Sequence, residues 1–189
     1  MDLSVDNYCI KVALRGISPM IWRRLRIAGN TSLADLHHIT QIAMGWDGEH
    51  LHCFHIYGED YGISYEGGLC FNHDVSEVFV GDFNFDTCDR FTYTSNFTAH
   101  WLCDVRVERT EQASKRVPNC FNSSGRLSEG GSRYDKPDVF FAMMEVPEEA
   151  VSVEETAEVG ELRLLIEYYE SVRFCQRSVN QRLKALLRS

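Results

Sequence analysis

The chain has 189 residues, of which 44% are hydrophobic and 12% aromatic, so it can form a compact domain with a sizeable core rather than a disordered chain. Its formal net charge of −9 argues against broad nucleic-acid binding, because a mostly acidic surface repels phosphate backbones. No apolar run approaches the roughly 18–20 residues that a membrane-spanning helix requires, and residues 1–12 lack the apolar segment of a signal peptide.

The seven cysteines are scattered along the chain, at positions 9, 53, 70, 88, 103, 120 and 175. Their number is odd, and the Cys-x-x-Cys pattern does not occur. This argues against a disulfide framework and against a structural zinc finger. The pattern is typical of a protein in the reducing cytoplasm. We expect most of these cysteines to pack in the core as small hydrophobic residues.

The first part of the chain predicts a hairpin, a helix and a strand. Hydrophobic residues alternate with other residues over 8–14 and 20–27, and Gly and Pro mark a turn between these two strands. Ser32 suits the N-cap of a helix that ends at Gly45, and residues 50–57 alternate again as a strand. This order favours an α+β fold with a β-grasp-like N-terminal unit, extended by further antiparallel strands.

Beyond this unit the hydrophobic pattern is less regular. Residues 58–76 are rich in Gly and polar residues and predict a loop with room for one short strand. Residues 78–80 and the long run 91–107 predict at least two further strands. Residues 110–138 predict an exposed loop because they are rich in Ser, Gly, Asn and charged residues.

The C-terminal region predicts a long helix, roughly 40 Å if it is continuous. Apolar residues recur there at alternating spacings of three and four, with Gln176 as a polar interruption. Such a heptad seam forms a homodimer or docks a partner helix, or it packs on the sheet of its own domain. The residues of this interaction helix are Leu162, Leu165, Tyr169, Val172, Val179, Leu183 and Leu186.

These patterns divide the chain into an α+β domain over 1–146 and a helical C-terminal extension over 147–189. The extension is predicted either to pack on the domain or to self-associate. Charge is uneven in this region: residues 145–170 carry a net charge of −8, and residues 171–189 carry +5. An acidic start and a basic end suit the dipole of a helix and require no further function.

Four short motifs in the first half occur in an order that resembles a known family. In chain order they are Leu14-x-Gly16-Ile17-x-Pro19-x-Ile21-Trp22-Arg23-Arg24, Leu33-x-x-Leu36-His37, Ala43-Met44-Gly45-Trp46 and His50-Leu51-His52-x-Phe54. Together they are similar to the plasmid pRiA4b ORF-3-like family, which is associated with mobile genetic elements. The resemblance implies a fold and a genetic setting, and it implies no particular reaction.

The resemblance is weaker in the second half. The family usually carries the run Tyr-Asp-Phe-Gly-Asp-x-Trp-x-His, which aligns with residues 95–103. This chain keeps the later aromatic residues but has Asn96 and Ala99 in place of the two acids and Cys103 in place of the histidine. If those polar positions form an active site in the family, this chain has lost it or changed its use.

Three histidines and one cysteine form a candidate metal site. His50 and His52 share a face of the expected strand 50–57, His37 lies on the expected helix, and Cys103 lies in the later strand run. Imidazole and thiolate groups are zinc ligands, so zinc is the metal that such a site would hold. The favoured alternative is that these side chains are hydrogen-bonded core or interface groups and that no cofactor is needed.

A second candidate site is basic. Trp22, Arg24 and Arg26 face one way on the expected strand 20–27, and Arg23 lies between them in sequence. Arginines beside an aromatic ring could bind phosphate or nucleic acid. The alternative is a solvent-exposed sheet face whose arginines pair with acidic residues, which the net charge of −9 favours.

Sequence motifs of catalysis are missing, including the glycine-rich phosphate loop and the Gly-x-Ser-x-Gly elbow. We therefore expect a non-enzymatic interaction or inhibitor protein that binds a protein of the host or of the mobile element. In one version of this hypothesis, the chain counters a host defence system. Two alternatives remain. One is a DNA-transaction accessory protein that uses the arginine face and the basic C-terminal residues, and the other is a metal-dependent site at the histidines.

Overall fold

Of the 189 residues, the computed structural model describes residues 6–16, 20–46, 48, 50–64, 68–97, 100–113, 117–124 and 174–186. The elements in this part of the chain are, in order, β1 (Asn7–Leu14), β2 (Trp22–Ala28), α1 (Leu33–Met44), β3 (His52–Ile56), β4 (Glu59–Gly62), the 3₁₀ helix η1 (Val80–Phe83), β5 (Arg90–Ser95), β6 (Trp101–Glu111), β7 (Asn119–Ser124) and α4 (Gln176–Leu186).

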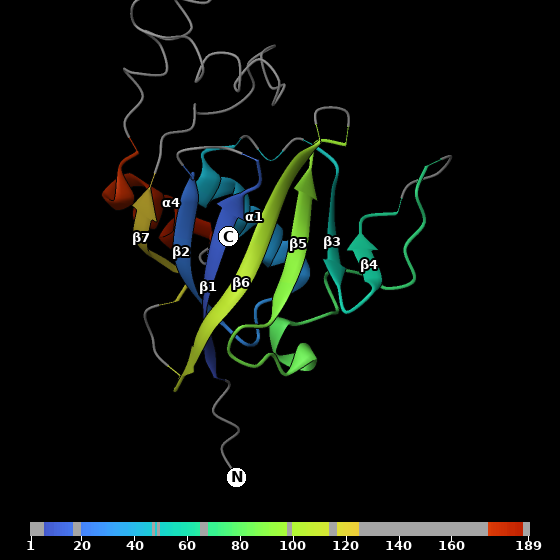
Figure 1. The fold of residues 1–189 in the computed structure, drawn as a ribbon, viewed down its shortest axis with the longest axis horizontal. Coiled ribbons are helices and arrows are strands. Elements are labelled where there is room, and N and C mark those ends of the chain that lie inside the picture. Colours follow the sequence, from blue (N-terminus) through green and yellow to red (C-terminus); the bar gives the residue numbers. More distant parts are fainter. Residues whose placement is uncertain are drawn as a thin grey trace, which may run out of the picture.

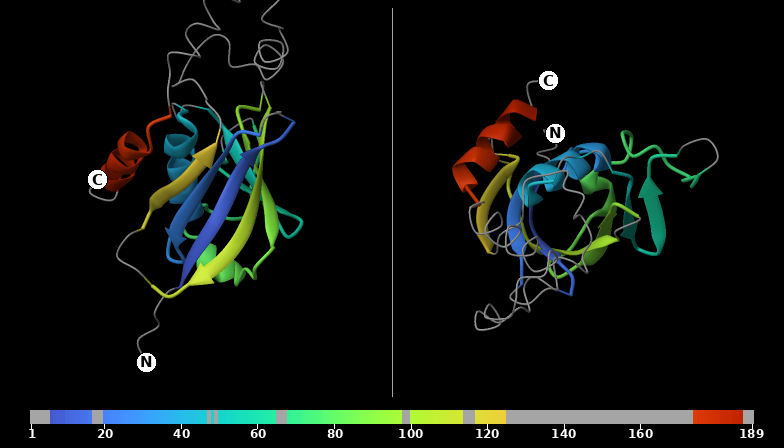
Figure 2. Two further views of the ribbon diagram at one scale, coloured as in Figure 1. Left: turned by 60° about the vertical axis from the view of Figure 1, so that its left-hand side comes forward. Right: turned by 90° about the horizontal axis from the view of Figure 1, so that it is seen from above.

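The strands form one seven-stranded sheet in the order β4-β3-β5-β6-β1-β2-β7. Every neighbouring pair is antiparallel. The α-helices of the described residues, α1 and α4, lie on the same side of this sheet (Figure 1). Figure 2 shows that the sheet is strongly curved and that α1 lies across its concave side. The expected α+β class with added antiparallel strands is confirmed.

The first part of the chain has the order that the sequence predicts. Ser32 caps α1, because its Oγ accepts a hydrogen bond from the N–H of Asp35 at 3.0 Å, and Gly45 ends the helix in the left-handed conformation at φ +82°. The position of one strand in the sheet does not follow from the order of the elements along the chain. Strand β3 lies apart from the β1–β2 hairpin, because β5 and β6 take the positions between them.

Three expectations for the second half are corrected. The expected strand over 78–80 is wrong: Phe79 makes a single bridge with Ser32, and η1 follows. The run 91–107 is two paired strands, β5 and β6, because the chain reverses between Asn96 and His100, which both have positive φ. The expected loop 110–138 contains β7, which pairs with β2.

The core lies between α1 and the inner face of the sheet. Leu36, Ile39 and Ala43 of α1 are almost fully buried, as are strand residues such as Leu25 and Val105. The opposite side of the sheet is here called the outer face. Most of its side chains are half-buried or exposed, among them Lys11, Ala13, Trp22, Arg24, Arg26, Thr92, Thr94, Asp104, Arg106 and Glu108.

Helix α4 covers the edge strand β7. Gln176 Nε2 and Asn180 Nδ2 each donate to the Cys120 carbonyl oxygen at 2.9 Å, and the Cys120 N–H donates to Asn180 Oδ1 at 2.8 Å. The Asn180 amide thus makes the two bonds that a neighbouring strand would make. An edge strand with such a cover is protected from pairing with another chain.

The expected single helix through 162–186 is wrong in its described part, because residues 174–175 are not helical and α4 begins at Gln176. Val179 and Leu183 are buried inside the domain at 8% and 0% exposure, and Leu186 packs against the same core. These positions are therefore unavailable as a dimer seam. The remaining seam residues, Leu162, Leu165, Tyr169 and Val172, lie outside the described residues.

The substitution Asn180→Leu should destabilise the protein by about 1–3 kcal/mol, because it leaves the Cys120 N–H without its partner at the sheet edge. The free energy of unfolding in urea measures this change, and faster hydrogen exchange at Cys120 localises it. Gln181→Leu on the exposed side of α4 is the matched control, with an expected change within about 0.5 kcal/mol. Wild-type exchange at Cys120 in Asn180→Leu would contradict the role of α4.

Candidate functional site

Two of the predicted metal-site histidines do meet. His37 on α1 and His52 on β3 are both 4% exposed, and their rings stack with centroids 3.5 Å apart and planes 10° apart. Phe54 and Tyr93 surround this stack with their rings. The pair is therefore part of the interior between α1 and the sheet.

A chain of hydrogen bonds leads to His37. The Gly48 N–H donates to Gln41 Oε1 at 3.1 Å, which orients that amide. Gln41 Nε2 then donates to the Tyr93 hydroxyl at 2.6 Å and to Ser95 Oγ at 2.9 Å. The Tyr93 hydroxyl oxygen lies 2.7 Å from His37 Nδ1. In the arrangement where this hydroxyl donates, the neutral His37 ring carries its proton on Nε2.

Burial keeps both histidines neutral. Desolvation lowers the pKa of His37 to about 3, with smaller contributions from His52 and His38, while a hydrogen bond with the Gly48 backbone acts in the opposite direction. Desolvation, and then His38, lowers the pKa of His52 to about 4. His52 Nε2 has no hydrogen-bond partner among the described residues, so a proton there would be a costly buried charge.

The four candidate zinc ligands do not form one site. The lone pairs of an imidazole lie in its ring plane, so the parallel rings of His37 and His52 cannot both point at one ion. His50 is exposed, and Cys103 is fully buried on β6, where burial raises the pKa of its thiol. Within the described residues, no three His, Cys, Asp or Glu side chains are arranged to hold a metal.

The predicted arginine face exists, but its arginines are paired. Arg24 donates to both carboxylate oxygens of Glu108, at 2.7 and 3.0 Å, and its guanidinium lies 4.7 Å from the Trp22 ring centre. Arg26 donates to Glu111 at 2.6 and 3.4 Å, which helps to lower the pKa of that carboxyl to about 2. A phosphate would have to displace these carboxylates. Arg24 and Arg26 therefore fit the alternative in which the arginines of this face pair with acidic residues.

Arg23 does not belong to this face, because alternate residues of a strand point to opposite sides. Its side chain is 1% exposed on the inner side of β2. The guanidinium donates to the carbonyl oxygens of Ala43, Trp22 and Ser124 at 2.9, 2.9 and 2.8 Å, and it lies 4.1 Å from the ring centre of Phe174. Arg23 is therefore a structural residue, and its assignment to a phosphate site is corrected.

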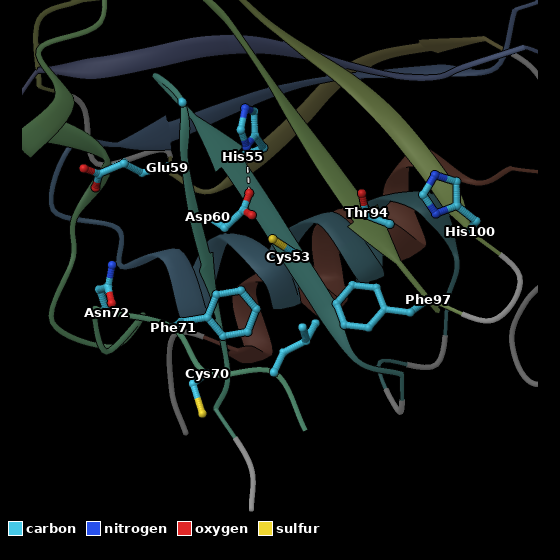
Figure 3. A pocket seen from close by; sticks show the side chains of 12 residues that line it. Cys53, His55, Glu59, Asp60, Cys70, Phe71, Asn72, Thr94, Phe97 and His100 are labelled. Atoms are coloured by element: carbon cyan, nitrogen blue, oxygen red, sulfur yellow. Dashed lines mark hydrogen bonds and ion pairs between the residues drawn. The ribbon is translucent and has the colours of Figure 1, made fainter. Parts of the chain in front are cut away.

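A pocket that the sequence did not predict opens on the outer face at β3, β4 and β5 (Figure 3). Its volume is about 620 Å³. Strand β3 contributes side chains that alternate with the buried His52 and Phe54, while loops contribute the aromatic rings. The lining residues are Cys53, His55, Gly58, Glu59, Asp60, Leu69, Cys70, Phe71, Asn72, Thr94, Phe97 and His100.

The polar groups of the pocket favour binding over nucleophilic catalysis. His55 Nδ1 lies 2.7 Å from Asp60 Oδ1, an arrangement that orients an imidazole. Cys53 lies on the same strand as His55, but burial and then the Asp60 carboxylate raise the pKa of its thiol to about 11. A thiol with this pKa is protonated at neutral pH and is a poor nucleophile.

Comparison with known proteins identifies the family. The family model described as plasmid pRiA4b ORF-3-like protein matches residues 6–130. The chain belongs to the plasmid pRiA4b ORF-3-like family. Among curated relatives, the protein named uncharacterized protein y4hQ of Sinorhizobium fredii is 29% identical over 102 residues, which is 53% of this chain and 53% of y4hQ. The match thus spans about half the length of that relative.

The fold is shared with a solved structure. The crystal structure of the protein of unknown function MM3350 from Methanosarcina mazei Go1 is 23% identical, with a TM-score of 0.72, and the match covers 92% of this chain and 96% of that chain. The family region holds every described strand, the histidine pair and the outer-face pocket, whereas α4 lies beyond it.

None of the described helices is long and apolar enough to cross a membrane.

Proposed function

We propose that this chain is a non-enzymatic protein-binding module carried by a mobile genetic element, and that the outer face of its sheet binds the partner. One observation carries the proposal. Both described helices cover the inner side of the sheet, and no other described segment crosses the outer face over β1, β2 and β6 (Figure 1). A broad sheet face that the described part of the chain leaves open in this way is suited to a second protein surface.

The paired arginines of this face support a protein partner rather than nucleic acid. Four ion pairs lie on it among the described residues, because Arg15 binds Asp104, Arg24 binds Glu108, and Arg26 and Arg109 both bind Glu111. Nucleic-acid affinity comes from cations that neutralise phosphates. Arg15 and Arg24 each pair with their own carboxylate, whereas Lys11, Arg90 and Arg106 on this face have no ion pair among the described residues. Arginine and tryptophan are enriched where protein partners bind each other, and Trp22 lies among the ion pairs.

A narrower form of the proposal is an inhibitor of a host defence protein. The net charge of −9 supports it, since an acidic chain is attracted to a partner with a basic surface. The most acidic segment, residues 145–170, lies outside the described residues. The experiment below therefore tests protein binding first, and the captured protein then identifies the partner.

The substitution Ala13→Arg should reduce partner capture at least about tenfold, because it places a long charged side chain at the centre of the outer face. Ala13 is half-buried on β1 and is paired with Trp22 and Asp104. The measurement is affinity capture of the tagged full chain from its native host lysate, with and without nuclease. Thermal unfolding of the variant checks that it remains folded.

Ser178→Arg provides the matched control, because Ser178 is exposed on α4. This variant should capture the same protein as the unchanged chain. Loss of capture in Ser178→Arg alone would place the interface on α4 and overturn the outer-face assignment. Recovery of nucleic acid, or of proteins that disappear after nuclease treatment, would instead support the alternative of a DNA-transaction accessory protein.

A further inference from the structure

The pocket on β3, β4 and β5 has two aromatic walls. Figure 3 shows Phe71 and Phe97 on opposite sides of Cys53. The Phe71 backbone N–H donates to Ser64 Oγ at 2.8 Å, and a Cβ atom on Gly62 would come within 2.6 Å of the Phe71 ring. The close approach of this ring therefore requires glycine at position 62, and the ring is held against the sheet by its neighbours.

The charges of the pocket are one-sided. Its lining includes the carboxylates Glu59 and Asp60 and contains neither Lys nor Arg. The Asp60 side chain is 61% exposed, so it can meet a ligand that enters from solvent, while its Oδ1 engages His55. An anionic ligand would be repelled at this point, and a cationic ligand would be attracted.

Aromatic walls and a carboxylate together select one kind of cation. The face of an aromatic ring attracts cations. The planar guanidinium group of arginine stacks on such a face and can donate hydrogen bonds to a carboxylate at the same time. The pocket between Phe71 and Phe97, with Asp60 beside it, offers both kinds of contact.

We infer that this pocket receives an arginine side chain of the partner protein and anchors it between Phe71 and Phe97 against Asp60. The inference rests on the proposed function, because Cys53, His55 and Thr94 point to the outer face that the partner is proposed to cover. A buried arginine anchor is a common source of affinity in protein interfaces.

The test uses the full chain and two short peptides, acetyl-Gly-Arg-Gly-amide and its neutral citrulline counterpart. In two-dimensional NMR titrations, the arginine peptide should shift the amide resonances of Cys53, Thr94 and Phe97 in a saturable way. The citrulline peptide should bind about twofold to fivefold more weakly, because it lacks the charge that pairs with the exposed Asp60 carboxylate. Asp60→Asn should weaken the arginine peptide by a similar factor.

Asp104→Asn is the matched control, because Asp104 is a similarly exposed outer-face carboxylate, at 50% against 61% for Asp60, and lies outside the pocket. It should leave the affinity for the peptide unchanged. Phe97→Leu should lower that affinity about twofold to fivefold, the amount expected from an exposed cation–π contact. Equal binding of both peptides, shifts elsewhere in the chain, or no saturable shift would each overturn the inference.

The two proposals can fail separately. If Ala13→Arg loses a protein partner while the arginine peptide does not bind, the pocket inference is wrong and the proposed function stands. If the peptide binds in the pocket but neither the unchanged chain nor Ser178→Arg captures a nuclease-resistant protein, the proposed function is wrong. In that case the pocket recognises guanidinium groups without serving an interface on this face.

Discussion

Replacing Arg23 with methionine should lower the free energy of unfolding by about 2–4 kcal/mol, because hydrogen bonds to a charged donor contribute roughly 1.5–3 kcal/mol each, while methionine avoids the cost of burying a charge. The guanidinium joins three parts of the fold, because it donates to Ala43 at the end of α1, to Trp22 on β2 and to Ser124 on β7. Methionine fills similar space but donates to none of these oxygens, so the buried Ala43 carbonyl loses its charged donor and the two part-buried strand carbonyls each lose a hydrogen bond.

The position of Ala43 adds to the expected effect. Its carbonyl is among the last of α1, where carbonyl oxygens have no partner within the helix and carry partial negative charge. The last turn of α1 contains no basic residue of its own. Arg23 supplies that cation from β2, and although burial lowers its pKa to about 10, it remains charged at neutral pH.

The neighbouring Arg24→Met is the control, because it makes the same substitution one residue away on the outer face. Arg24 is 32% exposed in its side chain, and among the described residues it binds Glu108 and the Trp22 ring, so its loss should change stability by about 1 kcal/mol or less. Urea unfolding of both variants measures the difference. Equal losses in the two variants would show that Arg23 has no structural role beyond that of its neighbour.

Lowering the pH should destabilise the protein well before its carboxylates titrate. His37 and His52 have pKa values of about 3 and 4 in the folded chain, against about 6.5 when unfolded. Between pH 6.5 and 4 the unfolded state therefore binds protons that the folded state does not. Stability is fully present above about pH 6.5 and falls with pH by up to about 1.4 kcal/mol per unit for each histidine.

The substitution His52→Phe separates the two histidines. It replaces one stacked ring with another, removes the unpartnered Nε2, and should roughly halve the loss of stability per pH unit while keeping neutral-pH stability close to that of the unchanged chain. The exposed His73→Gln serves as the control and should keep the full slope. Urea unfolding at pH 7, 6, 5 and 4.5 gives the slopes, and identical slopes for His52→Phe and the unchanged chain would contradict the assignment.

The alternating pattern of the first half predicted local structure well for a physical reason. The β1–β2 hairpin and α1 are decided by short-range features, such as the Ser32 cap and the left-handed Gly45. Strand β7 was missed because its Asn and Ser residues have the composition of a loop. It is a strand only because β2 offers a partner and α4 supplies Asn180 to its other edge.

The sequence by itself determined the α+β class, the family membership of its first half and the outward placement of Trp22, Arg24 and Arg26, because these depend on periodicity and local motifs. Only the tertiary structure decided what those side chains do. Glu108 and Glu111 lie about eighty residues from the arginines they neutralise. Phe71 and Phe97 reach the pocket from separate loops, and such long-range juxtapositions leave no spacing in the sequence from which to infer them.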